Sequence, residues 1–106
     1  MAKTVGYVGV LESETRGVPR LWFSLTDTAN GDNWIKIGSP RAWFTMNMES
    51  ADRPSHMAQL TLLLEAMRSR LPVEISHGGA ADFEKNAKND SFEVDGVKVA
   101  RAGHTF

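Results

Sequence analysis

The fold is decided by residues 42–76, which read AWFTMNMESADRPSHMAQLTLLLEAMRSRLPVEIS. At the start of this stretch, apolar residues at positions 42, 44, 46 and 48 alternate with Trp43, Thr45 and Asn47. Such alternation puts successive side chains on opposite faces of a strand and predicts that one face is turned toward a core. A leucine-rich run follows, and a second strand-like segment, 73–76, ends the stretch. The order strand, helix, strand is the framework for the rest of the chain.

The leucine-rich run predicts one long amphipathic helix over residues 54–70. Asp52 is a suitable N-cap, Pro54 fits the first turn, and Pro72 cannot continue a helix. At roughly 100° per residue, one broad apolar sector is expected to pack on the strands. Its members are Met57, Leu60, Leu63, Leu64, Met67 and Leu71.

The far side of this helix carries a narrower apolar strip of Ala58, Leu62 and Ala66. These residues recur at i, i+4 and i+8, where a lone monomer would normally carry charge. The strip is therefore a candidate oligomer interface. The alternative is ordinary, because isolated apolar residues are common on protein surfaces.

Three further strands are expected upstream. Residues 4–12 (TVGYVGVLE) predict a long first strand that bends or bulges at Gly6 or Gly9. Residues 20–26 alternate between an aliphatic face and a face with Trp22 and Ser24. Residues 34–37 are expected to form a hairpin with the strand that follows them.

Downstream of the strand at 73–76, a polar loop is expected from His77 to Asp90. The last strand is expected over 92–102. It contains Asp95-Gly96, which is interpreted as a bulge within one long strand rather than a hairpin turn, because arms of four residues make a weak hairpin.

Composition fits one domain, residues 1–106, of ordinary globular character, with 42% hydrophobic and 24% charged residues. A formal net charge of -1 supplies no global positive field, so non-specific nucleic-acid binding is not favoured. Cysteine is absent, which excludes disulfides and fits a reducing compartment. The chain shows no leader and no apolar run of membrane-spanning length. The expected location is cytoplasmic as the chain stands, or secreted if a signal has been removed, and no membrane insertion is expected.

The usual motifs of catalysis, phosphate binding and metal binding are missing. The chain has no G-x-x-x-x-G-K-[ST], G-x-G-x-x-G or G-x-S-x-G pattern, and the acidic loop at 27–33 lacks EF-hand spacing. His56, His77 and His104 are too scattered for a typical zinc site and are expected at the surface or in capping roles. Neither an enzymatic activity nor a cofactor or metal is expected.

The three tryptophans are the most informative side chains, since each lies in the register opposite the clean aliphatic face. An outward indole can stack on a sugar ring, a base or a partner subunit. The alternative is that a barrel buries both registers in places. The candidate ligand-binding residues are Trp22, Trp34 and Trp43 with the nearby cations Arg20, Lys36 and Arg41.

The expected order of elements, with the helix between the third and fourth barrel strands, is that of an OB-fold, a five-stranded Greek-key barrel. More narrowly, the chain resembles the pentameric B subunits of bacterial AB-type toxins of the cholera and Shiga kinds. The resemblance lies in WIKIGSPRAWF at 34–44, SHMAQLTLLLEA at 55–66 and LPVEIS at 71–76. It implies a ring in which five helices line a central pore. Those subunits normally carry a disulfide and a signal peptide, and this chain shows neither.

Together these observations favour a non-enzymatic, ring-forming subunit, a homopentamer by the resemblance, that binds a glycan or a partner protein. Weak sites repeated around a ring would gain avidity through effective concentration. The alternative is an OB-fold domain for single-stranded nucleic acid, using the tryptophans with Arg20, Lys36 and Arg41. A basic stripe beside the tryptophans would favour nucleic acid, and a polar pocket beside one of them would favour a sugar.

Overall fold

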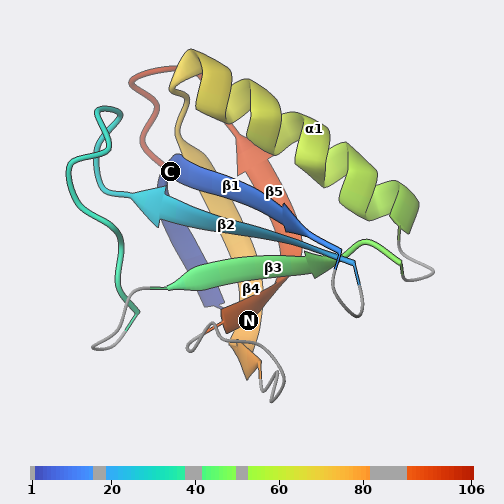
Figure 1. Cartoon of the computed structure of the whole chain (residues 1–106). Coiled ribbons are helices and arrows are strands. Elements are labelled where there is room, and N and C mark those ends of the chain that lie inside the picture. The colour runs from blue at the N-terminus through green and yellow to red at the C-terminus, as the bar shows by residue number, and fades with distance from the viewer. Residues whose placement is uncertain (1, 16–18, 38–41, 50–52, 82–90) are drawn as a thin grey trace.

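A computed structural model describes residues 2–15, 19–37, 42–49, 53–81 and 91–106. The expected mainly β domain with one long helix between the third and fourth strands is confirmed (Figure 1). Asp52, the expected N-cap, lies outside the described residues. The elements are β1 (Ala2–Glu14), β2 (Arg20–Thr26), β3 (Trp43–Asn47), α1 (Arg53–Ser69), β4 (Val73–Ala81) and β5 (Ser91–Val99).

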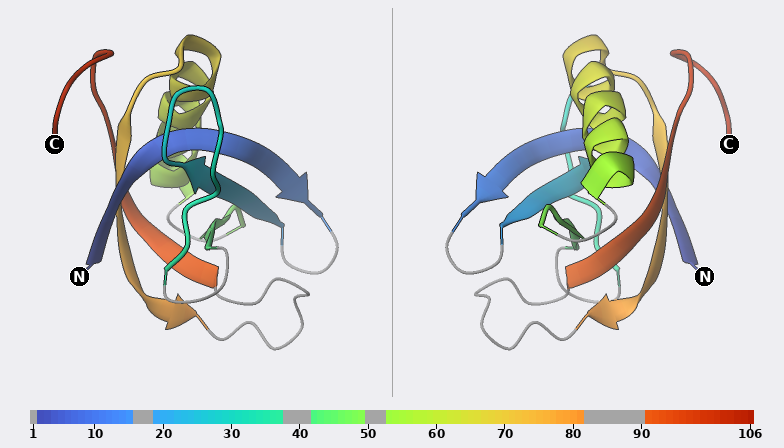
Figure 2. Two further views of the ribbon diagram at one scale, coloured as in Figure 1. Left: turned by 90° about the vertical axis from the view of Figure 1, so that its left-hand side faces the viewer. Right: turned by 90° about the vertical axis from the view of Figure 1, so that its right-hand side faces the viewer.

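The five strands close into a barrel in the order β1-β2-β3-β5-β4. The long β1 pairs with β4 through its first residues and with β2 through the remainder. All neighbouring strands are antiparallel except β3 and β5, which run parallel. The helix α1 lies across one end of the barrel and packs on β5, β1 and β3 (Figures 1 and 2).

The core lies inside the barrel and follows the predicted alternation. Leu21, Phe23 and Leu25 on β2 are buried, and Phe23 stacks on Phe44 of β3 with ring centroids 5.3 Å apart. Burying one such side chain contributes about 1.5–3 kcal/mol. The described core is completed by Val8, Ala42, Met46, Leu63, Ala66, Val73, Ile75, Phe92 and Val94.

The first strand bulges where the sequence predicts. Its pairing with β2 shifts register between Val8 and Val10, so that Gly9 is the extra residue. A Cβ atom on Gly9 would lie 2.7 Å from the Cγ2 atom of Thr26, closer than side chains approach. Glycine fits here because the side chain of Thr26 on β2 fills the space that a Cβ atom would need.

The segment at 34–37 was expected to be a strand, and that expectation is wrong. The structure gives single bridge positions at Trp34, which pairs with Thr26, and at Lys36, with no named strand over the described residues of this segment. Ile35 donates its N–H to the carbonyl of Leu25 and accepts from the N–H of Ala42. These few hydrogen bonds tie the segment to the barrel without building a ladder.

The loop expected to begin at His77 begins later, because β4 continues to Ala81; residues 82–90 lie outside the description. On β5, the predicted bulge is confirmed, since Ser76 pairs with Gly96 while His77 pairs with Val94, leaving Asp95 as the extra residue. A bulge of this kind bends its strand, here β5 where it pairs with β4.

His77 is buried, not at the surface as expected. Its Nδ1 atom lies 3.0 Å from the carbonyl oxygen of Gly78, which can only accept, so Nδ1 donates. The other ring nitrogen, Nε2, is hydrogen-bonded to the hydroxyl of Thr4, 2.8 Å away. Both ring nitrogens are satisfied, and the ring packs edge-on against Phe44 and Phe92. His77 is thus part of the barrel interior.

The helix is rotated relative to the prediction. Leu63 and Ala66, three residues apart on one face, are its buried residues. The small side chain of Ala66 lets the helix approach the barrel closely, so this residue faces the core and not the predicted outer strip. Part of the predicted core sector is consequently exposed, by 44% for Met57, 44% for Leu64 and 40% for Met67.

The helix ends in a Schellman motif. The N–H of Leu71 donates to the carbonyl of Ala66 at 2.9 Å, the bond that closes this motif. Arg70, the residue before Leu71, has a φ of 54°. This value lies in the left-handed region, where glycine is the usual residue. Pro72 follows, as expected for a helix that must stop.

Candidate functional site

Trp22 does not offer the exposed indole that the sequence suggested, because it is fully buried. It lies on the central strand of β1-β2-β3, opposite Glu12 on one side and Thr45 on the other. A paired strand therefore lies on each side of it. Its assignment as a ligand platform is corrected to a structural role in the barrel wall.

Arg20 lies beside this wall and is already paired. Its guanidinium Nη1 is 3.3 Å from Glu93 Oε2 and 3.3 Å from Thr45 Oγ1. An arginine whose charge is balanced by a carboxylate attracts a phosphate only weakly. Of the other two predicted cations, Lys36 is exposed and Arg41 lies outside the described residues. The described residues therefore place no basic stripe beside the tryptophans.

Trp34 and Trp43 form a pair at the surface. Both are half-buried, and their rings meet edge to face with centroids 4.9 Å apart. The indole N–H of Trp34 donates to the carbonyl of Ala42 at 3.0 Å. The ring of Trp34 is thereby held in one orientation before any ligand arrives, which lowers the entropy cost of binding.

A hollow of about 310 Å³ opens beside Trp34. We name it the Trp34 hollow; it is lined by Gly9, Val10, Ser24, Thr26, Gly31, Asp32 and Trp34. Its available polar group is the exposed carboxylate of Asp32. The hydroxyls of Ser24 and Thr26 belong to buried residues and already have partners in the chain, that of Ser24 accepting from the N–H of Val10 at 3.1 Å. An indole next to a carboxylate suits a ligand with both an apolar face and hydroxyl donors.

Asp32 is held in place by the loop between β2 and Trp34. Its Oδ2 atom accepts from the hydroxyl of Thr28 at 3.1 Å. The ends of the loop are clamped by Asp27, whose carboxylate accepts from both the backbone N–H and the side-chain amide of Asn33. Gly31 turns the chain with φ of 77°. The loop was recognised from the sequence as a turn, but its contribution to a binding site was not.

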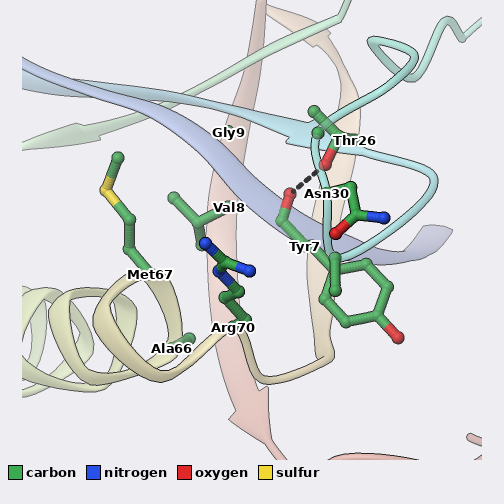
Figure 3. Close-up of a pocket in the computed structure, with 10 residues that line it drawn as sticks. Tyr7, Val8, Gly9, Thr26, Asn30, Ala66, Met67 and Arg70 are labelled. Atoms are coloured by element: carbon green, nitrogen blue, oxygen red, sulfur yellow. Dashed lines mark hydrogen bonds between the residues drawn. The ribbon is translucent and has the colours of Figure 1, made fainter.

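A second hollow of about 250 Å³ adjoins the first. It lies between β1, the same loop and the end of α1, and we name it the Tyr7–Arg70 hollow (Figure 3). Thr26 lies at the boundary of the two hollows. Its hydroxyl oxygen is 2.9 Å from the carbonyl oxygen of Thr28 and 3.3 Å from that of Tyr7, so its single proton is shared between the two acceptors. The lining residues are Tyr7, Val8, Gly9, Thr26, Ala29, Asn30, Gly31, Ala66, Met67 and Arg70.

Sequence reasoning missed Tyr7, Asn30, Asp32 and Arg70, since they come from three separate segments. The available signals were weak: a tyrosine in a bending strand, and an arginine where a helix normally ends in glycine. No group of three or more potential metal-ligating side chains occurs in the described part of the chain.

The predicted oligomer strip is divided by the rotation of the helix. Ala58 and Leu62 are exposed, Leu62 by 41%, whereas Ala66 is buried against the barrel. Ala66 is therefore corrected from an interface residue to a core residue. The two remaining members of the strip are accessible to another chain.

Comparisons with protein-family models, characterised proteins and solved structures found no significant match to this chain. Within the described ranges, no helix is both long and apolar enough to cross a bilayer.

Proposed function

We propose that this chain is a non-enzymatic OB-fold subunit that assembles into a homo-oligomeric ring and binds carbohydrate in the Trp34 hollow. The observation that carries the proposal is the hollow itself, which is lined by the fixed, half-buried indole of Trp34 and by the exposed carboxylate of Asp32. A sugar presents an apolar ring face to an indole and hydroxyl donors to a carboxylate.

The OB-fold assignment is supported by the strand order and by the position of the helix. The barrel order β1-β2-β3-β5-β4, with β3 parallel to β5 and α1 between β3 and β4, matches the five-stranded Greek-key arrangement. The resemblance to AB-type toxin B subunits makes a pentamer the preferred ring.

Charge disfavours the competing nucleic-acid function. The carboxylate of Asp32 lies in the hollow where a phosphate-bearing strand would stack, and Arg20 is neutralised by Glu93. With a net charge of -1, the chain gains little binding free energy from the release of counterions that nucleic acid holds. We therefore expect ligand binding to change little with salt.

The sugar site is tested with a glycan array and an oligonucleotide shift on the same preparation, for wild type and Trp34→Ala. The expected result is glycan binding that the substitution removes, with no oligonucleotide retained at physiological salt. A steeply salt-dependent, submicromolar affinity for an oligonucleotide would instead support the nucleic-acid function.

Ring assembly is tested by light scattering of Leu62→Glu, with Leu63→Glu as its matched control. Leu62 is 41% exposed and Leu63 is fully buried, although the two are adjacent. Burying one leucine contributes about 1.5–3 kcal/mol per subunit, repeated around a closed ring. Leu62→Glu should give a folded monomer, and Leu63→Glu should fail to fold. A wild type that is monomeric at micromolar concentration would exclude the ring.

A further inference from the structure

The loop between β2 and Trp34 contains an asparagine followed directly by a glycine, Asn30-Gly31. Both residues are exposed, and a Cβ atom on Gly31 would meet nothing within 4 Å. Gly31 therefore has no side chain to crowd its backbone nitrogen, and nothing else occupies that space. Asparagine is chemically labile, because the next backbone nitrogen can attack its side-chain carbonyl carbon and release the amide as ammonia. The sequence Asn30-Gly31 offers the least hindered form of this attack.

The side-chain amide of Asn30 makes no hydrogen bond within the described part of the chain. Asn33, in the same loop, differs in this respect. Its amide donates to Asp27 Oδ2 at 3.0 Å, and the bulky Trp34 follows it. An amide held in this way must break its hydrogen bond before its carbonyl carbon can meet the next backbone nitrogen. The loop thus contains one asparagine that is free to react and one that is restrained.

One hydrogen bond opposes the reaction at Asn30. The N–H of Gly31 donates to the carbonyl of Thr28 at 3.0 Å and closes a turn, so this bond must open before the nitrogen can attack. The turn lies in an exposed loop, and exposed loops open locally at a low free-energy cost. The bond therefore slows the reaction relative to an unfolded chain and does not prevent it.

A carboxylate at position 30 would share a hollow with a cation. Asn30 and Arg70 line the Tyr7–Arg70 hollow, Asn30 from the loop and Arg70 from the end of α1 (Figure 3). Arg70 has no ion pair among the described residues, in contrast to Arg20, which is paired with Glu93. Opposite charges that line one hollow attract each other. Conversion of Asn30 to an acid would therefore supply Arg70 with a partner.

We infer that Asn30 is a site of spontaneous deamidation and that the carboxylate formed there pairs with Arg70, which links the loop to the end of α1. The backbone nitrogen of Gly31 loses its proton to solvent and bonds to Cγ of Asn30. The Cγ–Nδ2 bond then breaks, and the nitrogen takes up a proton and leaves as ammonia. Water opens the cyclic imide at one of its two carbonyls and gives aspartate or isoaspartate. This inference is independent of the ligand that the protein binds.

The modification is tested by incubating the folded protein in mildly alkaline buffer and mapping its tryptic peptides by mass spectrometry. Cleavage after Arg20 and Lys36 gives one peptide, residues 21–36, that contains both Asn30 and Asn33. We expect the amide-to-acid mass change to develop severalfold faster at Asn30 than at Asn33, with aspartate and isoaspartate forms both present. Isoelectric focusing should show a more acidic species at the same rate.

The control for this test is Asn30→Gln, which keeps the amide but lengthens the side chain, so that ring closure is slower. This variant should not form the acidic species over the same period. The modification would be excluded if Asn30 stayed intact, or if it reacted no faster than Asn33.

The pairing with Arg70 is tested with Asn30→Asp, which has the aspartate product at this position. NMR follows the titration of its new carboxyl group, alone and in combination with Arg70→Gly or Arg68→Ala. Glycine suits the φ of 54° at position 70, so the first combination should fold. Arg68 is exposed on the same helix and does not line the hollow, so Arg68→Ala removes an equal charge elsewhere.

A paired cation stabilises the charged form of a carboxyl group and lowers its pKa. We therefore expect the pKa of the new carboxyl group to rise when Arg70→Gly is added and to stay constant when Arg68→Ala is added. An equal pKa with and without Arg70 would overturn the pairing. A rise as large with Arg68→Ala would also overturn it, because the effect would then come from the general charge of the helix.

Discussion

Trp22 and Trp34 are similar in the sequence and different in the structure. Both lie opposite the aliphatic register, yet Trp22 is fully buried between β1 and β3, while Trp34 is half-buried beside an open hollow. The difference arises from their neighbours. Trp22 has a paired strand on each side, whereas Trp34 lies in a segment attached to the barrel by an isolated bridge. Register determines which face a side chain takes, and the neighbouring strands determine whether that face is covered.

The largest difference between substituting Trp22 and substituting Trp34 is expected in the stability of the protein. Trp22→Ala should lower the free energy of unfolding by about 3–5 kcal/mol, because it empties a fully buried site in the barrel wall. Urea denaturation followed by circular dichroism measures this. A loss below about 1 kcal/mol would mean that Trp22 is not the structural tryptophan that we describe.

Trp34→Ala should show the opposite pattern. It should weaken glycan binding by about 1–3 kcal/mol, the usual effect of removing an aromatic stacking surface. The barrel should stay folded, since Trp34 lies outside the core, although the edge contact with Trp43 is lost. Calorimetry and thermal melting of the same sample check both parts. Unfolding of this variant would show that Trp34 belongs to the fold and not to a site.

Asp32→Asn should have a smaller effect, confined to binding. An ionised carboxylate accepts a hydroxyl hydrogen bond more strongly than an amide does, by about 1 kcal/mol. The amide oxygen can still accept from the hydroxyl of Thr28, so the loop should keep its shape. We expect the glycan affinity to fall severalfold and the unfolding midpoint to stay constant. An unchanged affinity would remove Asp32 from the site.

The smallest effect is expected for Glu93→Gln, which removes the ion pair with Arg20 near Trp22. Glu93 has a side chain that is 41% exposed, and pairs of this kind contribute about 0–1 kcal/mol to stability. Glycan binding should not change. If the variant acquired oligonucleotide affinity, Arg20 would be a masked nucleic-acid residue, and the wall around Trp22 would need a binding role after all.

Sequence reasoning predicted the elements well because their signals are local. Alternation identified β2 and β3, proline marked both ends of α1, and glycine marked the bulge in β1. The rotation of α1 was not predictable in the same way. Leucines occur on several sides of this helix, so the pattern allowed either Leu64 or Ala66 to face the barrel, and close packing selected the smaller residue.

The site was harder to predict because it is assembled from distant segments. Tyr7 and Arg70 come to line one hollow, and Asp32 and Trp34 the adjoining one, only after the barrel has closed and the helix has crossed its end. Trp34 was identified because an indole is informative wherever it occurs. The burial of Trp22 depends on the pairing of β2 with both neighbours, which no local pattern contains.

The central claim is that Trp34 serves binding while Trp22 serves the fold. The chain has three tryptophans, so a ¹⁵N-labelled sample gives three indole N–H signals, which can be assigned with single Trp→Phe variants. The most direct measurement follows these signals during titration with the glycan that binds best on the array. We predict that the Trp34 signal shifts saturably, the Trp43 signal follows weakly, and the Trp22 signal stays in place. A saturable shift of Trp22 with Trp34 unmoved would contradict the account.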